Sequence, residues 1–419
     1  MNVKVDLKVG DARIEGHCAP EFQIVLDEFI DNFENKNELG VSVALNIEGE
    51  SKVDLWGGFT KPIKTSDEPD EFRWQRDTLS IVFSCTKAAT ALCAHLLIDQ
   101  GRLDLHKNVS TYWPEFGVNG KEDITVEMML NHTAGLPALR EPVKKSGYTD
   151  WNYMIERLST EAPFWPPGTR NGYHMTTFGW TVGELVKRVS GLSLGTFFQK
   201  HIAEPLGIEF WIGLPHEHHH RVSRMQQWVA RSSEKLTPFT YELLNNKHSI
   251  QYLALLNTGR FRTDSPESYS AEYGAGGGIT NARNLAAMYL PLANKGMCGD
   301  LKFVSNNQIE LMAKTSVATL EDATLLMPTR FSLGFMRSMD NRHRETGHME
   351  SCIIGKEAFG HAGAGGSLGF ADPEANLSFS YTMNRMGAGI LLNERGQCLV
   401  DATYTSLGYQ SNKSGMWTK

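Results

Sequence analysis

Cysteine is scarce in this chain. Six cysteines occur among 419 residues, and no two of them form a C-x-x-C pair or a dense framework. That spacing argues against a small secreted domain held together by disulfides. It fits reduced thiols, so the sequence predicts a cytosolic type of compartment.

Long apolar runs and net positive charge are absent as well. No run approaches the roughly 18 residues that a membrane span needs, and the N-terminal segment lacks the apolar core of a signal peptide. The net charge of −7 at pH 7 argues against nucleic acid or an anionic membrane as the main partner. We expect a cytoplasmic protein with neither partner, and assembly into a homo-oligomer stays open.

The order of strand-like and helix-like segments indicates the architecture. Alternating apolar residues predict a hairpin over residues 41–56 and two strands over residues 367–370 and 377–383, whereas the middle of the chain has mostly helical spacing. We predict an α/β (α+β) fold, with an antiparallel sheet built from both chain ends and flanked by helices. Residues 1–83 and 271–419 would form this sheet domain. Residues 84–270 would form an inserted, mostly helical lobe, with the active site in the cleft between them.

The stretch from Ile81 to Thr90 carries the first candidate for chemistry. An apolar run reaches Ser84, and helical spacing begins there, so Lys87 lies one turn on and on the same face. A serine needs a base to take its proton before it becomes a good nucleophile. Burial lowers the pKa of a lysine, which can then act as that base. The helix N-terminus adds N–H groups where an oxyanion would form.

The S-x-x-K motif alone leaves a plainer interpretation open, in which Ser84 caps the helix and Lys87 is solvated. A second copy of the motif at Ser232–Lys235 lies in a polar run and is interpreted as a surface loop. Short motifs of this kind have a high false-positive rate. The rest of the chain has to decide between the two interpretations.

Two further segments add candidate residues. Pro167–Met175 precedes a helix and could project Tyr173 into a cleft, where a lysine ammonium would make the phenol more acidic and a phenolate could act as a base. The alternative is a half-buried aromatic residue with its hydroxyl bonded. Within Gly360–Ser367, His361 offers a donor, or a charge below about pH 6.5, to a substrate oxygen. Its alternative is a glycine-rich hairpin with a structural histidine.

Three blocks occur in order: S-x-x-K at Ser84–Lys87, P-G-x-x-x-x-Y at Pro167–Tyr173, and H-x-G at His361–Gly363. In this the chain resembles the serine β-lactamase-like superfamily, in the branch near class C β-lactamases, D-alanyl-D-alanine peptidases and bacterial-type carboxylesterases. The block Leu130–Leu136 and the triplet Trp56–Gly58 are also similar to that family. The likeness extends over roughly residues 20 to 408.

The resemblance implies a role for each matched residue. Ser84 would be the acylated nucleophile, Lys87 the adjacent base or proton shuttle, and Tyr173 the general acid and base that receives and returns the proton. The backbone N–H groups of Ser84 and Ala364 would form the oxyanion hole, and His361, Gly363 and Met175 would contact the substrate. The reaction would pass through an acyl-enzyme that water cleaves, with no metal and no cofactor.

Two departures from the family pattern bear on the substrate. The family's Y-x-N block reads Tyr173-His174-Met175, so the amide that contacts an acylamino group is missing. His361 replaces a lysine and so removes a permanent charge for a β-lactam carboxylate. Both changes favour an esterase-like hydrolase of small acyl esters. The alternatives are weak β-lactamase or D-alanyl peptidase activity, or a non-catalytic scaffold of the same fold.

Three other motifs are interpreted as accidental. Gly365–Gly369 matches G-x-S-x-G, but strand-like sequence follows Ser367 and no histidine lies beyond His361. His216–His220 matches H-E-x-x-H without the apolar periodicity of a zincin helix, so a charged surface loop is expected. Cys85, beside the candidate nucleophile, is interpreted as a small buried residue.

Overall fold

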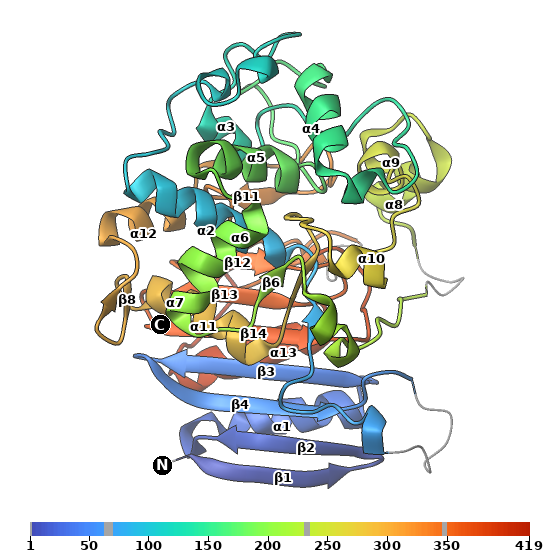
Figure 1. The fold of residues 1–419 in the computed structure, drawn as a ribbon. Helices are drawn as coiled ribbons and strands as arrows, with labels where there is room; N and C mark the ends of the chain where they lie inside the picture. Colours follow the sequence, from blue (N-terminus) through green and yellow to red (C-terminus); the bar gives the residue numbers. More distant parts are fainter. Residues whose placement is uncertain (1, 63–69, 230–234, 346–349) are drawn as a thin grey trace.

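The fold was analysed in a computed structural model, which describes residues 2–62, 70–229, 235–345 and 350–419. Its base is an antiparallel sheet of seven strands in the order β1-β2-β4-β3-β14-β13-β12 (Figure 1). The first half of the sheet comes from the N-terminal end of the chain and the second half from the C-terminal end. The strands are β1 (Val3–Val9), β2 (Ala12–Cys18), β3 (Gly40–Ile47), β4 (Glu50–Gly58), β12 (Phe359–Ala362), β13 (Leu368–Asp372) and β14 (Leu377–Met383).

The two chain ends meet where β3 pairs with β14, with Val43 opposite Tyr381. The predicted antiparallel sheet from both ends is therefore confirmed. The hairpin β1–β2 at the edge was not predicted. Apolar and charged residues do alternate along β1, but of its residues only Val5 is buried, because the strand lies at the edge of the sheet.

Helices cover both faces of the sheet. Side chains alternate along β14, so Ser380 faces one side, where its hydroxyl donates to the carbonyl of Ala282 in α11 (Ala282–Ala293). Tyr381 faces the other side, within the apolar cluster that contains residues of α1 (Gln23–Glu34) and α13 (Glu394–Ser406). Small and polar residues therefore meet α11, and large apolar residues fill the space under the terminal helices.

The helical part lies above the β12 edge of the sheet in Figure 1. Its centre is α2 (Cys85–Asp99), in which every side chain from Cys85 to Leu97 is buried. This helix contacts β12, α5 (Phe178–Ser190) and α6 (Leu194–Phe198). The remaining helices are α3 (Val126–Leu130), α4 (Trp151–Thr160), α7 (Glu204–Leu206), α8 (Pro238–Asn245), α9 (Ile250–Leu255), α10 (Pro266–Tyr269) and α12 (Asn306–Ala313).

Several short strands pair outside the seven-stranded sheet. One three-stranded sheet has the order β5-β7-β6, and two small hairpins are formed by β8 with β9 and by β10 with β11. These strands are β5 (Ser80–Ile81), β6 (Trp211–Ile212), β7 (Gly278–Thr280), β8 (Met297–Cys298), β9 (Leu301–Lys302), β10 (Val317–Thr319) and β11 (Thr329–Phe331). In the described part of the chain, none of the helices has the length and apolar character that crossing a membrane requires.

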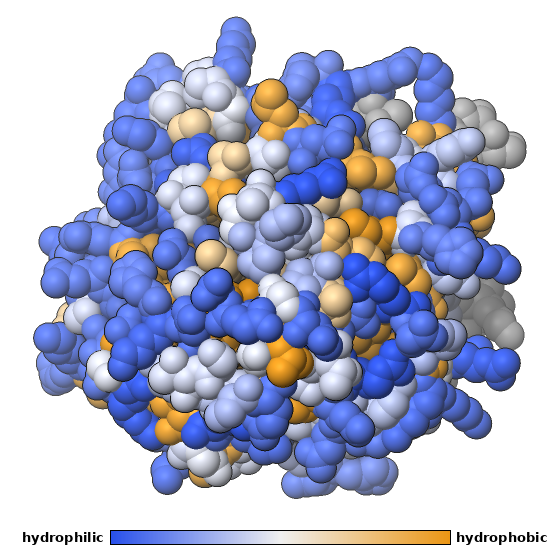
Figure 2. All heavy atoms as spheres, turned by 90° about the horizontal axis from the view of Figure 1, so that it is seen from above, coloured by the Kyte–Doolittle hydropathy of each residue, from blue (hydrophilic) through white to orange (hydrophobic). Residues whose placement is uncertain are grey.

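Seen from above, over the helical part, the surface is mostly hydrophilic (Figure 2). Apolar side chains appear there in separate groups between polar ones. Tyr241 and Leu244 of α8 are among the exposed apolar residues of the chain. Scattered exposure of this kind is ordinary for a folded protein.

Candidate active site

A sharp turn places Ser84 at the start of α2. The chain leaves β5, its Val82 N–H donates to the carbonyl of Gly278 at 3.0 Å, and Phe83 then adopts a left-handed conformation with φ +44°. Such a conformation costs a non-glycine residue roughly 1–2 kcal/mol, and backbone strain of this kind clusters at functional sites. The Ser84 hydroxyl makes no capping hydrogen bond to the helix, so it is free to meet another partner.

That partner is Lys87, whose Nζ lies 3.2 Å from the Ser84 Oγ. The Lys87 side chain is completely buried, and its Nζ also donates to the carbonyls of Met175 at 2.7 Å and Ala275 at 2.8 Å. Among the described residues no carboxylate forms an ion pair with it. Burial therefore lowers the pKa of Lys87 well below its usual range. In its neutral form, which burial favours, the amine can donate two N–H groups to the two carbonyls and accept the proton of the Ser84 hydroxyl.

Tyr173 lies against the same lysine, with the Lys87 Nζ 4.8 Å from the centre of its ring. The ring stacks on Phe331 at 5.6 Å and meets the edge of His132 at 5.0 Å. Its hydroxyl is buried and makes no hydrogen bond to the described residues. Burial raises the pKa of Tyr173 far above its usual range, and the nearby Ser84 hydroxyl only partly opposes this. The structure thus reverses the expected acidification of the phenol, because burial disfavours a phenolate.

The turn between β12 and β13 brings Ala364 to the pocket that Ser84 lines. Gly363 allows this approach, since a Cβ at that position would lie 2.3 Å from the carbonyl oxygen of Val82. Among the described residues no acceptor takes a hydrogen bond from the N–H of Ser84 or of Ala364. Two unpaired N–H groups beside a serine hydroxyl are the arrangement that an oxyanion hole requires.

The structure places His361 behind the pocket and not on its wall. Its side chain is 1% exposed, its Nδ1 donates to the carbonyl of Ala362 at 2.7 Å, and its Nε2 is buried without a partner among the described residues. Burial, with Lys87 nearby, lowers the pKa of His361 to about 3, and burial lowers that of His174 to about 4. Both imidazoles are therefore neutral near pH 7.

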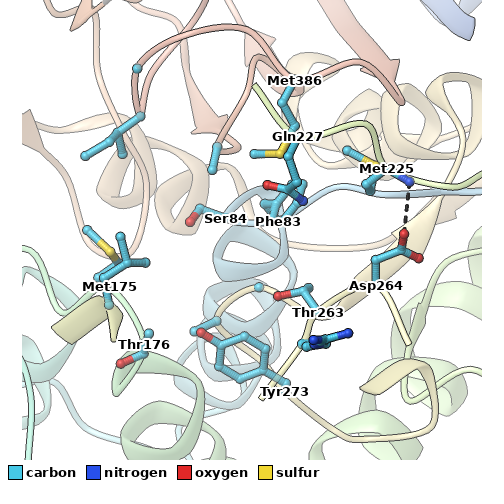
Figure 3. Close-up of a pocket in the computed structure, with 17 residues that line it drawn as sticks. Phe83, Ser84, Met175, Thr176, Met225, Gln227, Thr263, Asp264, Tyr273 and Met386 are labelled. Atoms are coloured by element: carbon cyan, nitrogen blue, oxygen red, sulfur yellow. Dashed lines mark hydrogen bonds between the residues drawn. The ribbon is translucent and has the colours of Figure 1, made fainter. Parts of the chain in front are cut away.

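Ser84 opens into a pocket of about 650 Å³ (Figure 3). In this view Met175 and Thr176 lie on one side of Ser84, Met225 and Asp264 lie on the other, and Tyr273 lies below. The apolar part of the lining consists mainly of Phe83, Met175, Met225, Leu255, Met386 and Ile390. Methionine side chains adapt to the shape of what they contact, so this wall suits apolar groups of varied outline.

Charge is sparse in the lining, where Arg262 and Asp264 are the charged residues. The Asp264 carboxylate accepts the N–H of Met225 at 3.1 Å and the hydroxyl of Tyr269, and it lies 3.5 Å from Arg224. The Arg262 guanidinium has no hydrogen-bond or ion-pair partner among the described residues. The pocket therefore carries one uncompensated positive charge.

Sequence reasoning missed two contributions to this site. The carbonyl oxygens of Met175 and Ala275, which hold Lys87, belong to the backbone and leave no trace in residue type. Asp322 is fully buried and accepts the N–H of Tyr173, yet it lies about 150 residues away in a segment without any motif. No pattern in the sequence could have revealed either contribution, because both depend on how distant segments meet.

The motifs interpreted as accidental have plain structural surroundings. Ser367 is buried, and β13 begins directly after it, so no helix follows the G-x-S-x-G match. His216–Arg221 is a 3₁₀ helix of six residues, where a charged surface loop was expected. Cys85 is buried, and all six cysteines are free. Ser232 of the second S-x-x-K copy lies outside the described residues.

Comparison with known proteins agrees with this geometry. The family model for Beta-lactamase matches residues 26–395. The esterase/beta-lactamase LipL of Mycobacterium tuberculosis is 29% identical over 388 residues, which cover 91% of this chain and 85% of that protein.

Solved structures are similar over a comparable length. A family VIII carboxylesterase is 35% identical, with a TM-score of 0.80 over 94% of this chain and 99% of that one. A penicillin-binding protein homolog from Caulobacter crescentus is 32% identical, with the same TM-score and coverage. These findings confirm the predicted superfamily and the predicted class of enzyme, a serine hydrolase. The chain belongs to the beta-lactamase family.

Proposed function

We propose that the protein is a carboxylesterase that hydrolyses small acyl esters through an acyl-enzyme on Ser84. The observation that carries this proposal is the contact of the Ser84 hydroxyl with a buried, neutral Lys87 amine at one apolar pocket. The esterase names of two relatives, LipL and the family VIII carboxylesterase, support the same conclusion.

Acylation begins when the Ser84 Oγ attacks the ester carbonyl and its proton passes to the Lys87 Nζ. The carbonyl oxygen becomes negative and accepts the N–H groups of Ser84 and Ala364. Tyr173, a neutral phenol, donates its proton to the departing alkoxide, and the Lys87 ammonium returns a proton to the phenolate. The alcohol leaves, and both groups regain their starting protonation states.

Deacylation repeats the sequence with water as the nucleophile. Lys87 accepts a proton from the water as its oxygen attacks the acyl carbonyl. The tetrahedral intermediate collapses, the bond to the Ser84 Oγ breaks, and the proton returns to that oxygen. The products are a carboxylic acid and the free enzyme, so no cofactor enters the balance.

The lining of the pocket supports an ester in preference to a β-lactam or a peptide. Met175 presents a thioether in place of an amide, so it cannot bond to an acylamino group. His361 is neutral and buried, and so it supplies no charge for a β-lactam carboxylate. We therefore place weak β-lactamase or D-alanyl peptidase activity second.

The free cysteines support the predicted reducing, cytoplasmic location.

The test compares the wild type with Ser84→Ala and, as a matched control, Ser367→Ala. Each protein is exposed to a fluorophosphonate, weighed by intact-protein mass spectrometry, and assayed with p-nitrophenyl butyrate. We expect one adduct and ester turnover in the wild type and in Ser367→Ala. In Ser84→Ala we expect no adduct and a loss of turnover of at least about 10⁴-fold. A folded wild type without adduct or turnover would overturn the proposal in favour of a scaffold.

A further inference from the structure

A buried carboxylate holds the backbone of Tyr173. Asp322 is completely inaccessible to solvent and lies in the connection between β10 and β11. Its two carboxylate oxygens each lie 3.0 Å from the backbone nitrogen of Tyr173, whose N–H they share. In the described part of the chain no cation forms an ion pair with it.

Other neutral donors complete the shell of this carboxylate. The Oδ1 atom accepts the N–H groups of Thr324 at 2.8 Å and Leu325 at 2.9 Å, and the Oδ2 atom accepts the hydroxyl of Thr329 at 3.3 Å. The three backbone N–H groups, of Tyr173, Thr324 and Leu325, can only donate, so an acceptor-only group fits here. An asparagine would turn its NH₂ toward a donor on one side or the other.

The same hairpin makes two further contacts with the segment that contains Tyr173. Phe331 in β11 stacks flat on the phenol ring, with an interplanar angle of 3°. Asn171, two residues before Tyr173, accepts the Ala323 N–H on its backbone carbonyl at 3.0 Å. Its side-chain oxygen lies 3.2 Å from the Thr329 hydroxyl, whose one proton it shares with Asp322. The hairpin is itself tied to α9, because the Gln251 amide donates to the carbonyls of two of its residues.

These supports matter because the hydroxyl end of Tyr173 has none. Its oxygen makes no hydrogen bond to the described residues, although the Ser84 hydroxyl lies near it, so the ring is located mainly through its backbone and its faces. A displacement of about 1 Å in a catalytic group can cost about 10²-fold in rate. The hydrogen bond that Asp322 accepts from the Tyr173 N–H therefore helps to set where the phenol lies relative to Ser84.

We propose that Asp322 is a positioning residue of the esterase reaction, which acts by fixing the backbone of Tyr173 so that the phenol faces Ser84. The inference rests on the proposed function, in which Tyr173 protonates the leaving group. It assigns to the β10–β11 hairpin a part in catalysis although the hairpin contributes no residue to the lining of the pocket.

The test is a double-mutant cycle that combines Asp322→Asn with Tyr173→Phe, followed by kcat and KM for p-nitrophenyl butyrate. In the wild-type background we expect Asp322→Asn to lower kcat by about 10²-fold with KM nearly unchanged. In the Tyr173→Phe background, assayed at higher enzyme concentration, the same change should lower kcat by less than about twofold. Non-additivity of this kind identifies residues that act through one another.

Asp372→Asn is the matched control. Asp372 is also fully buried, and its carboxylate accepts the backbone N–H of Glu374 at 3.0 Å and the Tyr404 hydroxyl at 2.7 Å, but it has no contact with Tyr173. The Asp372→Asn substitution should lower the melting temperature of the protein and leave kcat within about twofold of the wild-type value. Thr329→Val, which removes one donor to Asp322, serves if Asp322→Asn does not fold, and it should show a smaller loss with the same dependence on Tyr173.

Two results would overturn the inference. One is a folded Asp322→Asn protein, or a folded Thr329→Val protein in its place, with wild-type kcat. The other is an equal loss in both backgrounds, which would show a general structural effect. Failure of the proposed function looks different, because either the wild type would then show no turnover or Ser84→Ala would retain it.

Discussion

The Nζ atom of Lys87 lies 3.2 Å from the Oγ atom of Ser84, and burial lowers the pKa of the amine well below its usual range. A base of this kind works above its pKa and fails when it is protonated. We therefore expect kcat/KM for p-nitrophenyl butyrate to fall as the pH is lowered through the depressed pKa of Lys87. The measurement is a pH profile over about pH 4 to 9, in which this single acid limb is fitted.

Lys87→Arg tests the assignment of that limb. A guanidinium stays charged at every pH in the range and cannot accept the serine proton. We expect a loss of about 10²- to 10⁴-fold in kcat/KM and no remaining acid limb from residue 87. An unchanged acid limb in the variant would assign it to another group.

The neutral state of His95 in α2 predicts how stability depends on pH. Its Nε2 donates to the carbonyl of Leu333 at 2.7 Å, and its Nδ1 accepts the Gln308 amide at 2.6 Å, so a second proton would face a donor. Burial lowers the pKa of His95 to about 4. Between about pH 6.5 and 4 the unfolded chain binds a proton that the folded protein does not, so stability falls as the pH is lowered.

The expected loss from this one residue is about 3 kcal/mol by pH 4. It is measured by urea unfolding at several pH values on the wild type and on His95→Gln, which cannot titrate. The variant should show a smaller slope of unfolding free energy against pH in this window. Equal slopes would mean that the imidazole does not contribute as described.

Gly363→Ala is expected to damage the oxyanion hole. The added Cβ would lie 2.3 Å from the Val82 carbonyl oxygen, so the β12–β13 turn must move and carry the Ala364 N–H with it. Removal of one oxyanion donor typically costs about 10²- to 10³-fold in kcat. Steady-state kinetics check this, and a wild-type kcat would contradict it.

Gly408→Ala is the control for that substitution. Gly408 has φ +80° and open space where a Cβ would lie, so the change costs only about 1 kcal/mol of backbone strain. It should lower stability and leave kcat unchanged. The comparison separates steric displacement at the active site from a general loss of stability.

Arg262 predicts a preference in substrate charge. Its guanidinium lines the pocket without a partner among the described residues, so an ester that carries a carboxylate gains an attraction that a neutral ester lacks. An exposed ion pair is worth up to about 1 kcal/mol. Arg262→Gln should therefore lower kcat/KM about two- to fivefold for the p-nitrophenyl monoester of glutaric acid and leave p-nitrophenyl butyrate unaffected.

Arg260→Gln provides the comparison, because Arg260 is a nearby exposed arginine that does not line the pocket. Arg260→Gln should leave kcat/KM unchanged for both esters. Equal effects of Arg262→Gln on both esters, or equal effects of the two variants, would remove the proposed role of charge. Raising the salt concentration should reduce the preference of the wild type.

Much of the fold followed from local pattern. Alternation over residues 41–56 and 377–383 predicted β3, β4 and β14, because one face of each strand meets a core. The hairpin of β1 and β2 was not predicted, although apolar and charged residues alternate along β1. The division into residues 1–83 with 271–419 and an inserted lobe of residues 84–270 stays a prediction.

For the site, too, the sequence predicted some features and not others. Residue types and their order along the chain identified Ser84, Lys87 and Tyr173 as candidates, since nucleophile and base on one helical turn leave a recognisable spacing. Spacing contains no information on burial. The prediction that the pKa of Tyr173 is lowered was therefore wrong, and the position of His361 behind the pocket was not predicted.

By itself the sequence determined the family, the antiparallel sheet from both chain ends and the chemical groups available for catalysis. Only the tertiary structure decided that Lys87 is a buried amine bonded to two carbonyls, and that Asp322 accepts the N–H of Tyr173 from about 150 residues away. The physical reason is that residue type sets what a group can do. Its protonation and its position depend on desolvation and on contacts between segments that are distant in the chain.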